Sequence, residues 1–332
     1  MNEPERNNEG RAQPGAMCWA WRLTQFREFM IVVVILRAAV AMSCASKDFR
    51  TPGNVLAMLL GLSVESIVAI GMTILLVSGG FDLSVGSTVA FTGAVTAMCL
   101  VAGAPVPVAV AAGLALGVLI GLINGVIIAK IGINPFITTL GMMSVVRGAL
   151  LVVTGGKNIS GLPESFTVIG QGQMIGIQYP IVIAAVLVVI GDLLLRKSRF
   201  FRQNYYLGGN EKAAILSGIA VDRLKIFNYA LTGFLAALAG VVMTARFGSA
   251  SVTSGTGLEL RVISAVIIGG ASLQGGEGTV LGSFLGSLLM AIIVGSLTLL
   301  GVNVYWTQLV IGATLLIAVL IDTLGKRRQR LV

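Results

Sequence analysis

Histidine is absent from this sequence of 332 residues, and cysteine occurs only three times, at Cys18, Cys44 and Cys99. The missing histidine excludes catalytic sites that use an imidazole base, and it removes a common zinc ligand. The cysteines are odd in number and widely spaced, which argues against a disulfide framework or a cysteine-based metal site. We therefore predict no catalytic residues, no metal and no cofactor in this chain.

Charged residues are also scarce, at 11% of the chain, while hydrophobic residues make up 56% and the mean hydropathy is +0.94. A soluble domain of this length needs far more polar surface, so the composition indicates a polytopic membrane protein. The 43 glycines fit transmembrane helices that pack closely through small residues. In such an apolar chain the net charge of +9 reflects membrane topology, and we expect no nucleic-acid partner.

Ten apolar runs are long enough to cross a bilayer, which takes about 20 residues. They cover residues 28–46, 54–78, 84–102, 106–129, 135–154, 179–195, 226–245, 258–273, 279–300 and 304–322. Five runs precede Gln178 and five follow it, and an odd number per half gives halves of inverted topology, a frequent transporter architecture. The sequence predicts an all-α polytopic membrane protein with about ten transmembrane helices, some of them broken or re-entrant.

The basic residues predict the orientation of the chain. An N-terminus in the cytosol places most of the 23 lysines and arginines on the cytosolic side, including those of loop 196–225 and of the C-terminal tail. This asymmetry satisfies the positive-inside rule. We predict a disordered cytosolic N-terminus over 1–27, a transmembrane domain over 28–325 and a basic cytosolic tail over 326–332.

A short polar helix is predicted within the basic loop 196–225. Asn210 suits its N-cap, Ala213 and Ala214 propagate it, and Gly218 suits a left-handed end. A surface helix adds nothing to the apolar core of a membrane protein. It is either an ordinary solvated loop helix or a docking element for a partner, and the local residues leave both readings open.

A first glycine-rich string interrupts the apolar pattern around Asp82, which lies between Gly80 and Ser84. Non-helical backbone at membrane depth persists only when it is buried in protein or lines a wet cavity. One reading is a capped loop at the membrane surface, with Asp82 as N-cap of the helix that begins near Ser84. The other is a broken helix that borders a permeation path.

A second glycine-rich string contains Gly269, Gly270 and Ser272, and it allows the same two readings. Its residues 269–274 resemble residues 79–84, but the two strings follow the second and eighth runs. Two inverted halves of five runs would not superimpose them.

Ionisable residues inside the apolar runs are costly unless they face the bundle interior or water. Arg37, Glu65 and Arg147 lie within runs, and Glu259 and Arg261 lie near one membrane face. Arg37 either snorkels or pairs with Glu65. Glu259 and Arg261 are two positions apart, so they diverge on a helix and are not expected to pair. We place Glu65 with the residues of the two glycine strings on the predicted translocation path.

Four strings, taken in order, resemble the ribose-type monosaccharide ABC transporter permeases. They are Gly79–Ser87, Gly208–Asn210 with the following Ala213-Ala214 and Ser217-Gly218-Ile219, Ala236–Gly240, and Ile268–Gly278. The resemblance runs through residues 50–322. It implies a permease subunit of an importer in the bacterial inner membrane that passes a monosaccharide across the bilayer. The implied partners are a cytosolic ATPase, a periplasmic sugar-binding protein, a second permease subunit (identical or related) and the lipid bilayer.

The resemblance also gives the polar helix a role, because ABC permeases dock into the ATPase through an Ala-Ala-x-x-x-Gly signature. The expected coupling residues are Gly208, Gly209, Asn210, Ala213, Ala214, Ser217 and Gly218. One departure is Arg261, which stands where the family usually has an acidic or small residue.

The sequence also lacks a phosphate-binding loop, since Gly155-Gly156-Lys157-Asn158 has neither the upstream glycine nor the following Ser or Thr. We therefore expect no ATPase activity in this chain. Two other classes remain as hypotheses. An ion-coupled secondary transporter would use carboxylates such as Glu65 and Asp82, and a membrane-embedded enzyme would need a cluster of nucleophiles or metal ligands.

Overall fold

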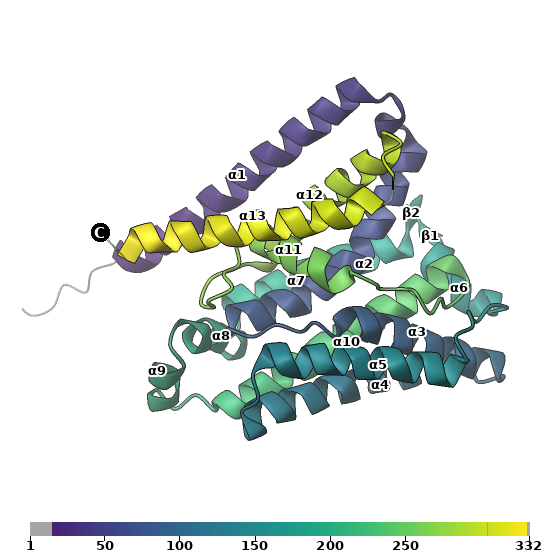
Figure 1. Ribbon diagram of the computed structural model, residues 1–332, viewed down its shortest axis with the longest axis horizontal. Coiled ribbons are helices and arrows are strands. Elements are labelled where there is room, and N and C mark those ends of the chain that lie inside the picture. Colours follow the sequence, from purple (N-terminus) through teal and green to yellow (C-terminus); the bar gives the residue numbers. More distant parts are fainter. Residues whose placement is uncertain (1–14, 304, 331–332) are drawn as a thin grey trace, which may run out of the picture.

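The computed structural model describes residues 15–303 and 305–330, and helices dominate it (Figure 1). The first half contains α1 (Gly15–Ala45), η1 (Asp48–Arg50), α2 (Pro52–Val77), α3 (Val85–Val101), α4 (Val106–Val126), the π-helical η2 (Ile127–Ile131) and α5 (Pro135–Thr154). A connection follows with α6 (Glu164–Gln171), β1 (Gln173–Met174) and β2 (Ile177–Gln178). The second half contains α7 (Tyr179–Lys197), α8 (Arg199–Gly209), α9 (Glu211–Leu216), α10 (Val221–Phe247), α11 (Leu258–Ile268), α12 (Val280–Leu299) and α13 (Tyr305–Arg330).

The helix lengths confirm the predicted all-α membrane fold with broken segments. In the described part of the chain, eight helices are long and apolar enough to cross a membrane. The other two predicted spans, 84–102 and 258–273, correspond to α3 with 17 residues and α11 with 11. Each of these short helices follows a stretch without α-helix, over 78–84 and 248–257.

The N-terminal prediction differs from the structure. Helix α1 begins at Gly15, so residues 15–27, which we expected to be disordered, are helical. Residues 15–21 are apolar or small, and the helix continues through the more polar residues 22–27 into the apolar run. Residues 1–14 and the last two residues of the predicted tail lie outside the described part of the chain.

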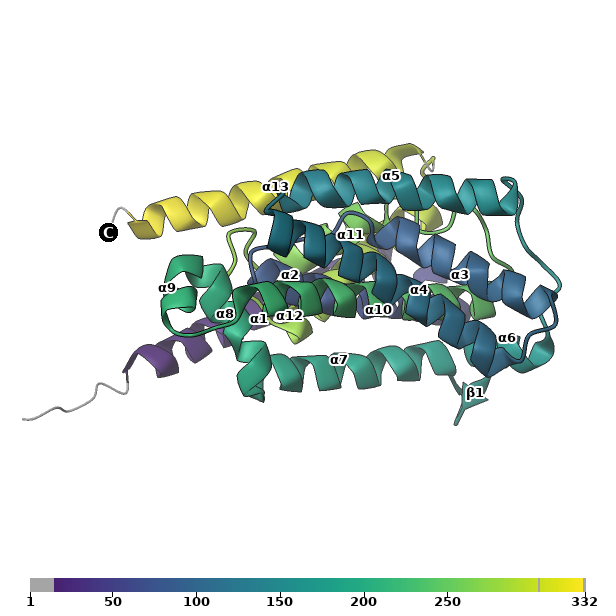
Figure 2. The ribbon, with the colours of Figure 1, turned by 90° about the horizontal axis from the view of Figure 1, so that it is seen from below.

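The two halves pack in the same order but run in opposite directions. We call the end of the bundle that carries α9 the α9 end, and the opposite end, which carries α6, the α6 end. Helix α2 runs toward the α9 end, and α10 runs from the α9 end toward the α6 end (Figures 1 and 2). Helix α4 packs on α10 as α12 packs on α2. Likewise, α3 packs on α4 and α5 as α11 packs on α12 and α13. The structure therefore shows the inverted topology that an odd number of spans per half implies.

The short helices α3 and α11 begin beside each other inside the bundle. A Cβ atom on Gly86 would collide with the carbonyl of Gly255, and a Cβ atom on Gly255 would collide with the carbonyl of Gly86. Only glycine allows two backbones to approach this closely. From this contact α3 runs to the α6 end and α11 to the α9 end. The inverted counterpart of segment 78–84 is therefore segment 248–257, and the similarity of 79–84 to 269–274 does not mark the repeat.

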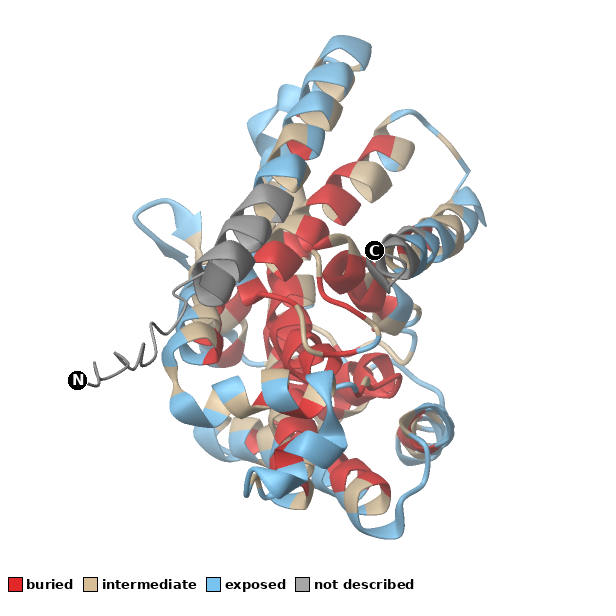
Figure 3. Cartoon of the chain, turned by 90° about the vertical axis from the view of Figure 1, so that its left-hand side faces the viewer, coloured by how far each residue is buried: buried red, intermediate tan, exposed pale blue. Residues whose placement is uncertain are grey.

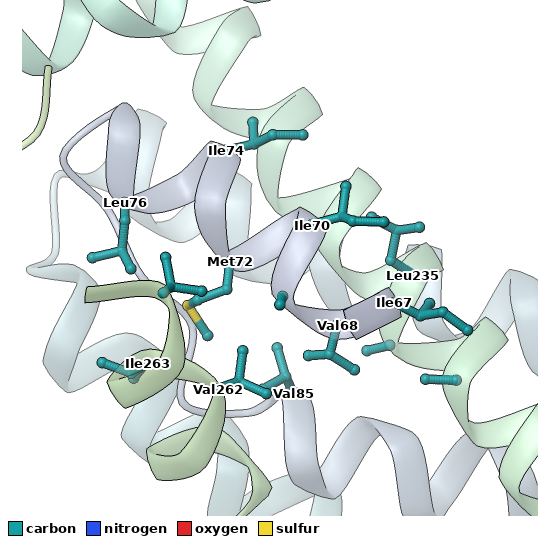
Figure 4. Packing of buried hydrophobic residues seen from close by; sticks show 14 of the residues in the cluster. Ile67, Val68, Ile70, Met72, Ile74, Leu76, Val85, Leu235, Val262 and Ile263 are labelled. Carbon is teal, nitrogen blue, oxygen red and sulfur yellow. The ribbon is translucent and has the colours of Figure 1, made fainter. Parts of the chain in front are cut away.

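Helix α2 lies at the centre of the hydrophobic core. Its Ile67 and Met72 pack with Val262 of α11, Val85 of α3 and Leu235 of α10 (Figure 4). Burial is concentrated around this helix, and exposure increases toward the outer helices (Figure 3). The apolar outer faces of α5 and α13 remain exposed, as expected of helices in contact with lipid.

Small residues hold the inner helices together. Gly117 of α4 and Gly233 of α10 are so close that a Cβ on either would strike the other's carbonyl. A hydrogen bond of 2.7 Å from the Thr73 hydroxyl to the Ser283 hydroxyl joins α2 to α12. Close backbone approach and hydroxyl pairs of this kind stabilise helix contacts where lipid provides no hydrophobic drive between helices.

Candidate functional site

Helix α9 has the ends that the sequence predicts. The Oδ1 atom of Asn210 accepts a hydrogen bond of 3.1 Å from the backbone N–H of Ala213, which makes Asn210 the N-cap. Gly218 has a φ of +81°, the left-handed conformation that glycine adopts without steric cost. Both local predictions are confirmed.

Ala214 was expected among the residues that contact the ATPase, but it lies on the buried face of α9. This side chain is only 2% exposed and packs with Leu207, Val221 and Leu224 of the adjoining helices. The outward apolar residues are Leu216, which is 88% exposed, and Ile215. Sequence reasoning missed these two because it followed the small residues. The available signal was the adjacent apolar pair Ile215-Leu216 in a basic loop.

Gly208, at the end of α8, joins this surface helix to the transmembrane core. A Cβ atom on Gly208 would collide with the carbonyl oxygen of Val77 and with the backbone of Gly275 and Gly276. The N–H of Gly276 donates to that same carbonyl of Val77 at 2.8 Å. One contact therefore joins the end of α2, the end of α8 and the second glycine string. We call this contact the glycine junction.

A tyrosine reinforces the glycine junction. The Tyr205 hydroxyl of α8 donates a hydrogen bond of 2.7 Å to the carbonyl of Gly278. Burial raises the pKa of Tyr205 to about 12, so the phenol stays protonated and remains a donor at physiological pH. This hydrogen bond links α8 to the segment that precedes α12.

Asp82 lies buried inside the bundle on the segment that precedes α3. Its Oδ1 accepts hydrogen bonds from the Ser84 N–H at 2.7 Å and the Ser84 hydroxyl at 2.6 Å, and Oδ2 accepts from the Asn124 amide at 3.4 Å. The N-cap of α3 is Ser84, so the prediction that Asp82 caps the helix is wrong. The carboxylate lies two residues before the cap and turns onto Ser84 and α4.

Gly80 lies in the same segment, 78–84. A Cβ atom there would be 2.9 Å from the Tyr229 hydroxyl of α10, and that hydroxyl donates to the carbonyl of Phe81 at 3.1 Å. The first glycine string is therefore broken backbone packed inside the protein. The surface-loop reading does not describe it.

Glu65 pairs with Arg261 across the bundle, joining α2 to α11. The Arg261 Nε lies 3.1 Å from the Glu65 Oε1, although the N–H does not align for a hydrogen bond. Glu65 therefore does not pair with Arg37, which is exposed on α1. Arg261 was not expected to pair with Glu259, and its ion-pair partner is indeed Glu65.

A cavity of about 400 Å³ adjoins the Glu65–Arg261 pair. It lies toward the α6 end, between the first half of α2, the C-terminal parts of α10 and α12, and the start of α11 inside the bundle. We call it the α6-end cavity. Its wall includes apolar side chains such as Met58 and Val294 and a second arginine, Arg246.

The remaining predicted pathway residues lie elsewhere. Gly269 packs against the backbone of Gly282, which keeps α11 and α12 close, and Gly270 forms the turn after α11 with a φ of +95°. Ser272 is fully buried and its hydroxyl accepts from the Gln274 N–H at 3.1 Å. The predicted set thus divides among the α6-end cavity (Glu65), the bundle interior (Gly80, Asp82 and Ser84) and the α9 end (Gly269, Gly270 and Ser272).

A mainly helical bundle with inverted halves, two short helices that begin beside each other inside it and an ion pair beside a cavity is typical of a membrane transport permease. The chain belongs to the family described as branched-chain amino acid transport system / permease component, whose model matches residues 54–319. No solved structure gave a significant match.

Among curated proteins, the chain is similar to pentose permeases from several bacteria. It is 42% identical over 307 residues to the ribose import permease protein of Escherichia coli K12, covering 91% of this chain and 94% of that protein. Identity to the ribose import permease protein of Bacillus subtilis 168 is 40% over 303 residues, or 91% and 92% of the two chains. The L-arabinose ABC transporter permease protein of Azospirillum brasilense is 37% identical over 310 residues, or 93% and 91%.

Proposed function

We propose that this chain is the membrane-spanning permease subunit of an ATP-binding-cassette importer that carries a monosaccharide, ribose or a related pentose, across the bacterial inner membrane. The observation that carries the proposal is the near full-length similarity to permeases named for ribose and arabinose. The family description names branched-chain amino acids, but the relatives in hand at 37–42% identity are named for pentoses.

A separate ATPase docks on the surface formed by α8 and α9, and the α9 end is cytosolic in this proposal. The exposed Leu216 and Ile215 supply apolar contact, while Gly208 links the docking helix to α2. The basic residues around α8 suit the cytosolic side. Both termini are then cytosolic, since α1 begins and α13 ends at the α9 end (Figure 1).

The opposite α6 end faces the periplasm and receives the sugar from a binding protein. A second permease subunit completes the membrane unit, as in the family that the sequence resembles. The transmembrane domain of this proposal spans residues 28–325, with the basic tail over 326–332 beyond it.

The ion-coupled alternative receives no comparable support. Such a transporter needs a carboxylate that gains and loses a proton or cation during the cycle. Glu65 is paired with Arg261, and Asp82 is engaged by Ser84 and Asn124. Both carboxylates therefore already have partners within the fold.

The proposal is tested in the organism that carries this chain. Deletion of its coding sequence should abolish high-affinity uptake of labelled ribose or arabinose and leave leucine uptake unchanged, and the wild-type chain should restore the lost activity. Loss of leucine uptake with normal pentose uptake would overturn the assigned substrate class.

A further inference from the structure

The α6-end cavity combines an apolar wall with a small number of polar groups. Its volume of about 400 Å³ falls within the range of small-molecule sites, roughly 300–1,000 Å³. The polar side chains on the wall are those of Asn54, Glu65, Arg246, Arg261 and Thr298. Small-molecule sites commonly have this composition, with apolar contact area and a few polar groups that fix orientation.

Charged side chains inside a membrane bundle cost free energy, so their presence at this cavity indicates a function. Glu65 and Arg261 are 15% and 29% exposed and come from two different helices. Since no aligned hydrogen bond locks the pair, both groups keep hydrogen-bonding capacity for a third partner. Among the described residues Arg246 forms no ion pair, and its guanidinium lies 5.0 Å from the centre of the Phe247 ring.

We infer that the α6-end cavity is a binding site for a neutral monosaccharide on its way through the permease, with Glu65 and Arg261 as specificity-determining residues. This inference rests on the proposed function. A sugar hydroxyl both donates and accepts hydrogen bonds, so the carboxylate accepts from one hydroxyl while the guanidinium donates to its neighbour. The apolar wall from α2 and α12 contacts the C–H face of the ring.

The position of the cavity fits one stage of import. It opens between the ends of α2, α10 and α12 at the α6 end, which faces the periplasm in our proposal. Its inner wall includes Gly255 and Leu258, at the point where α11 begins beside α3. A bound sugar therefore touches the contact between the starts of α3 and α11, and movement of α11 against α3 would release it inward.

Two glycines provide a matched test of occupancy. Gly61 lines the cavity from α2 and a Cβ atom there meets no atom within 4 Å; the same holds for the helical Gly141 of α5, outside the cavity. Gly61→Leu should fill the cavity and reduce pentose uptake by the assembled importer to background, while Gly141→Leu should retain it. Equal uptake by both variants, at equal membrane levels, would overturn the inference.

Substrate protection tests the ligand directly. The variant carries Ala291→Cys on the cavity wall, and serine replaces the native Cys18, Cys44 and Cys99. Membranes that contain the whole importer with this variant are treated with a water-soluble thiol reagent. Only empty cavities react, so ribose or arabinose at ten times its dissociation constant should slow modification about tenfold. Cysteine at the exposed loop residue Ser160 is the control, and its modification should not respond to sugar.

The outcomes separate this site from the proposed function. Protection by a pentose that weakens in Glu65→Gln, with the control unchanged, supports the site. An importer that transports pentose while Ala291→Cys stays unprotected, or never reacts, overturns the site and leaves the function standing. Protection by leucine and not by pentose would overturn the sugar assignment of both.

Discussion

Asp82 shows how this bundle accommodates a buried carboxylate with neutral partners. Three hydrogen-bond donors, from Ser84 and Asn124, satisfy it at the start of α3. Removing the acceptor would leave the two Ser84 donors unsatisfied, at about 1–3 kcal/mol each, while the Asn124 amide keeps its hydrogen bond of 3.1 Å to the Ser84 hydroxyl. Removing only the charge is a smaller change. The Oδ1 atom of Asn124 makes no hydrogen bond to any described residue, so it is free to accept from a new amide after a side-chain flip.

We expect Asp82→Asn to keep most of the pentose uptake, because an asparagine oxygen still accepts from Ser84. Asp82→Leu should lose uptake and lower the thermal midpoint of the purified protein. Uptake and melting of both variants check this. Loss of uptake in Asp82→Asn at unchanged stability would show that the charge itself acts in transport.

The glycine junction allows a comparison of adjacent residues. Gly208→Ala should clash with the Val77 carbonyl and the Gly275 backbone, at a cost of about 1–3 kcal/mol for overpacking. Gly209→Ala should be neutral because a Cβ atom there meets nothing within 4 Å. We expect Gly208→Ala to lower sugar uptake per ATP hydrolysed, measured in the assembled importer. If the two variants behave alike, α8 does not transmit motion through this contact.

At the scale of elements, the residues of α9 that we propose to dock on the ATPase are exposed, while Ala214 is buried against the adjoining helices. Leu216→Ser should weaken the ATPase complex about ten- to a hundredfold, because burial of a leucine contributes about 1.5–3 kcal/mol. It should leave the melting temperature of the isolated permease unchanged, since the side chain is 88% exposed. Ala214→Trp should instead destabilise the α8–α9 packing. Affinity measured with the purified subunits, beside melting curves, distinguishes the two; a full-affinity Leu216→Ser complex would remove α9 from the interface.

Elements that depend on local signals could be predicted from the sequence, and those that depend on distant contacts could not. Apolar length gave most of the spans, and single residues gave the cap and the end of α9. The pairing of Glu65 with Arg261 joins residues almost two hundred positions apart, so no spacing rule could reveal it. Segment 248–257 was also missed, because its Ser, Thr and Gly residues resemble an ordinary loop while its role comes from contact with Gly86.

On the scale of the whole molecule, the proposed ATPase-docking surface on α8 and α9 and the α6-end cavity lie at opposite ends of the bundle. We expect a membrane-impermeant thiol reagent to label Ser160→Cys from the outside of intact cells. Ser217→Cys, which follows α9, should react only after permeabilisation. The reverse pattern would invert the orientation and place the cavity on the cytosolic side.

The inverted halves also suggest how a local movement becomes a transport step. Gly208 of α8 contacts the end of α2 and the second glycine string, and α11 connects that string to the cavity. These packed contacts form a continuous route between the two ends of the molecule along which a movement of α8 would reach the cavity.

Transport by the purified importer shows whether ATP hydrolysis drives a pentose through this permease. The permease is reconstituted in liposomes with its ATPase and sugar-binding protein. The compartment that the ATPase faces is supplied with ATP in one sample and left without ATP in the other. We expect accumulation of labelled ribose or arabinose that requires ATP and the binding protein and persists when ion gradients are collapsed. Accumulation driven by an ion gradient without ATP, or accumulation of leucine in place of pentose, would contradict this expectation.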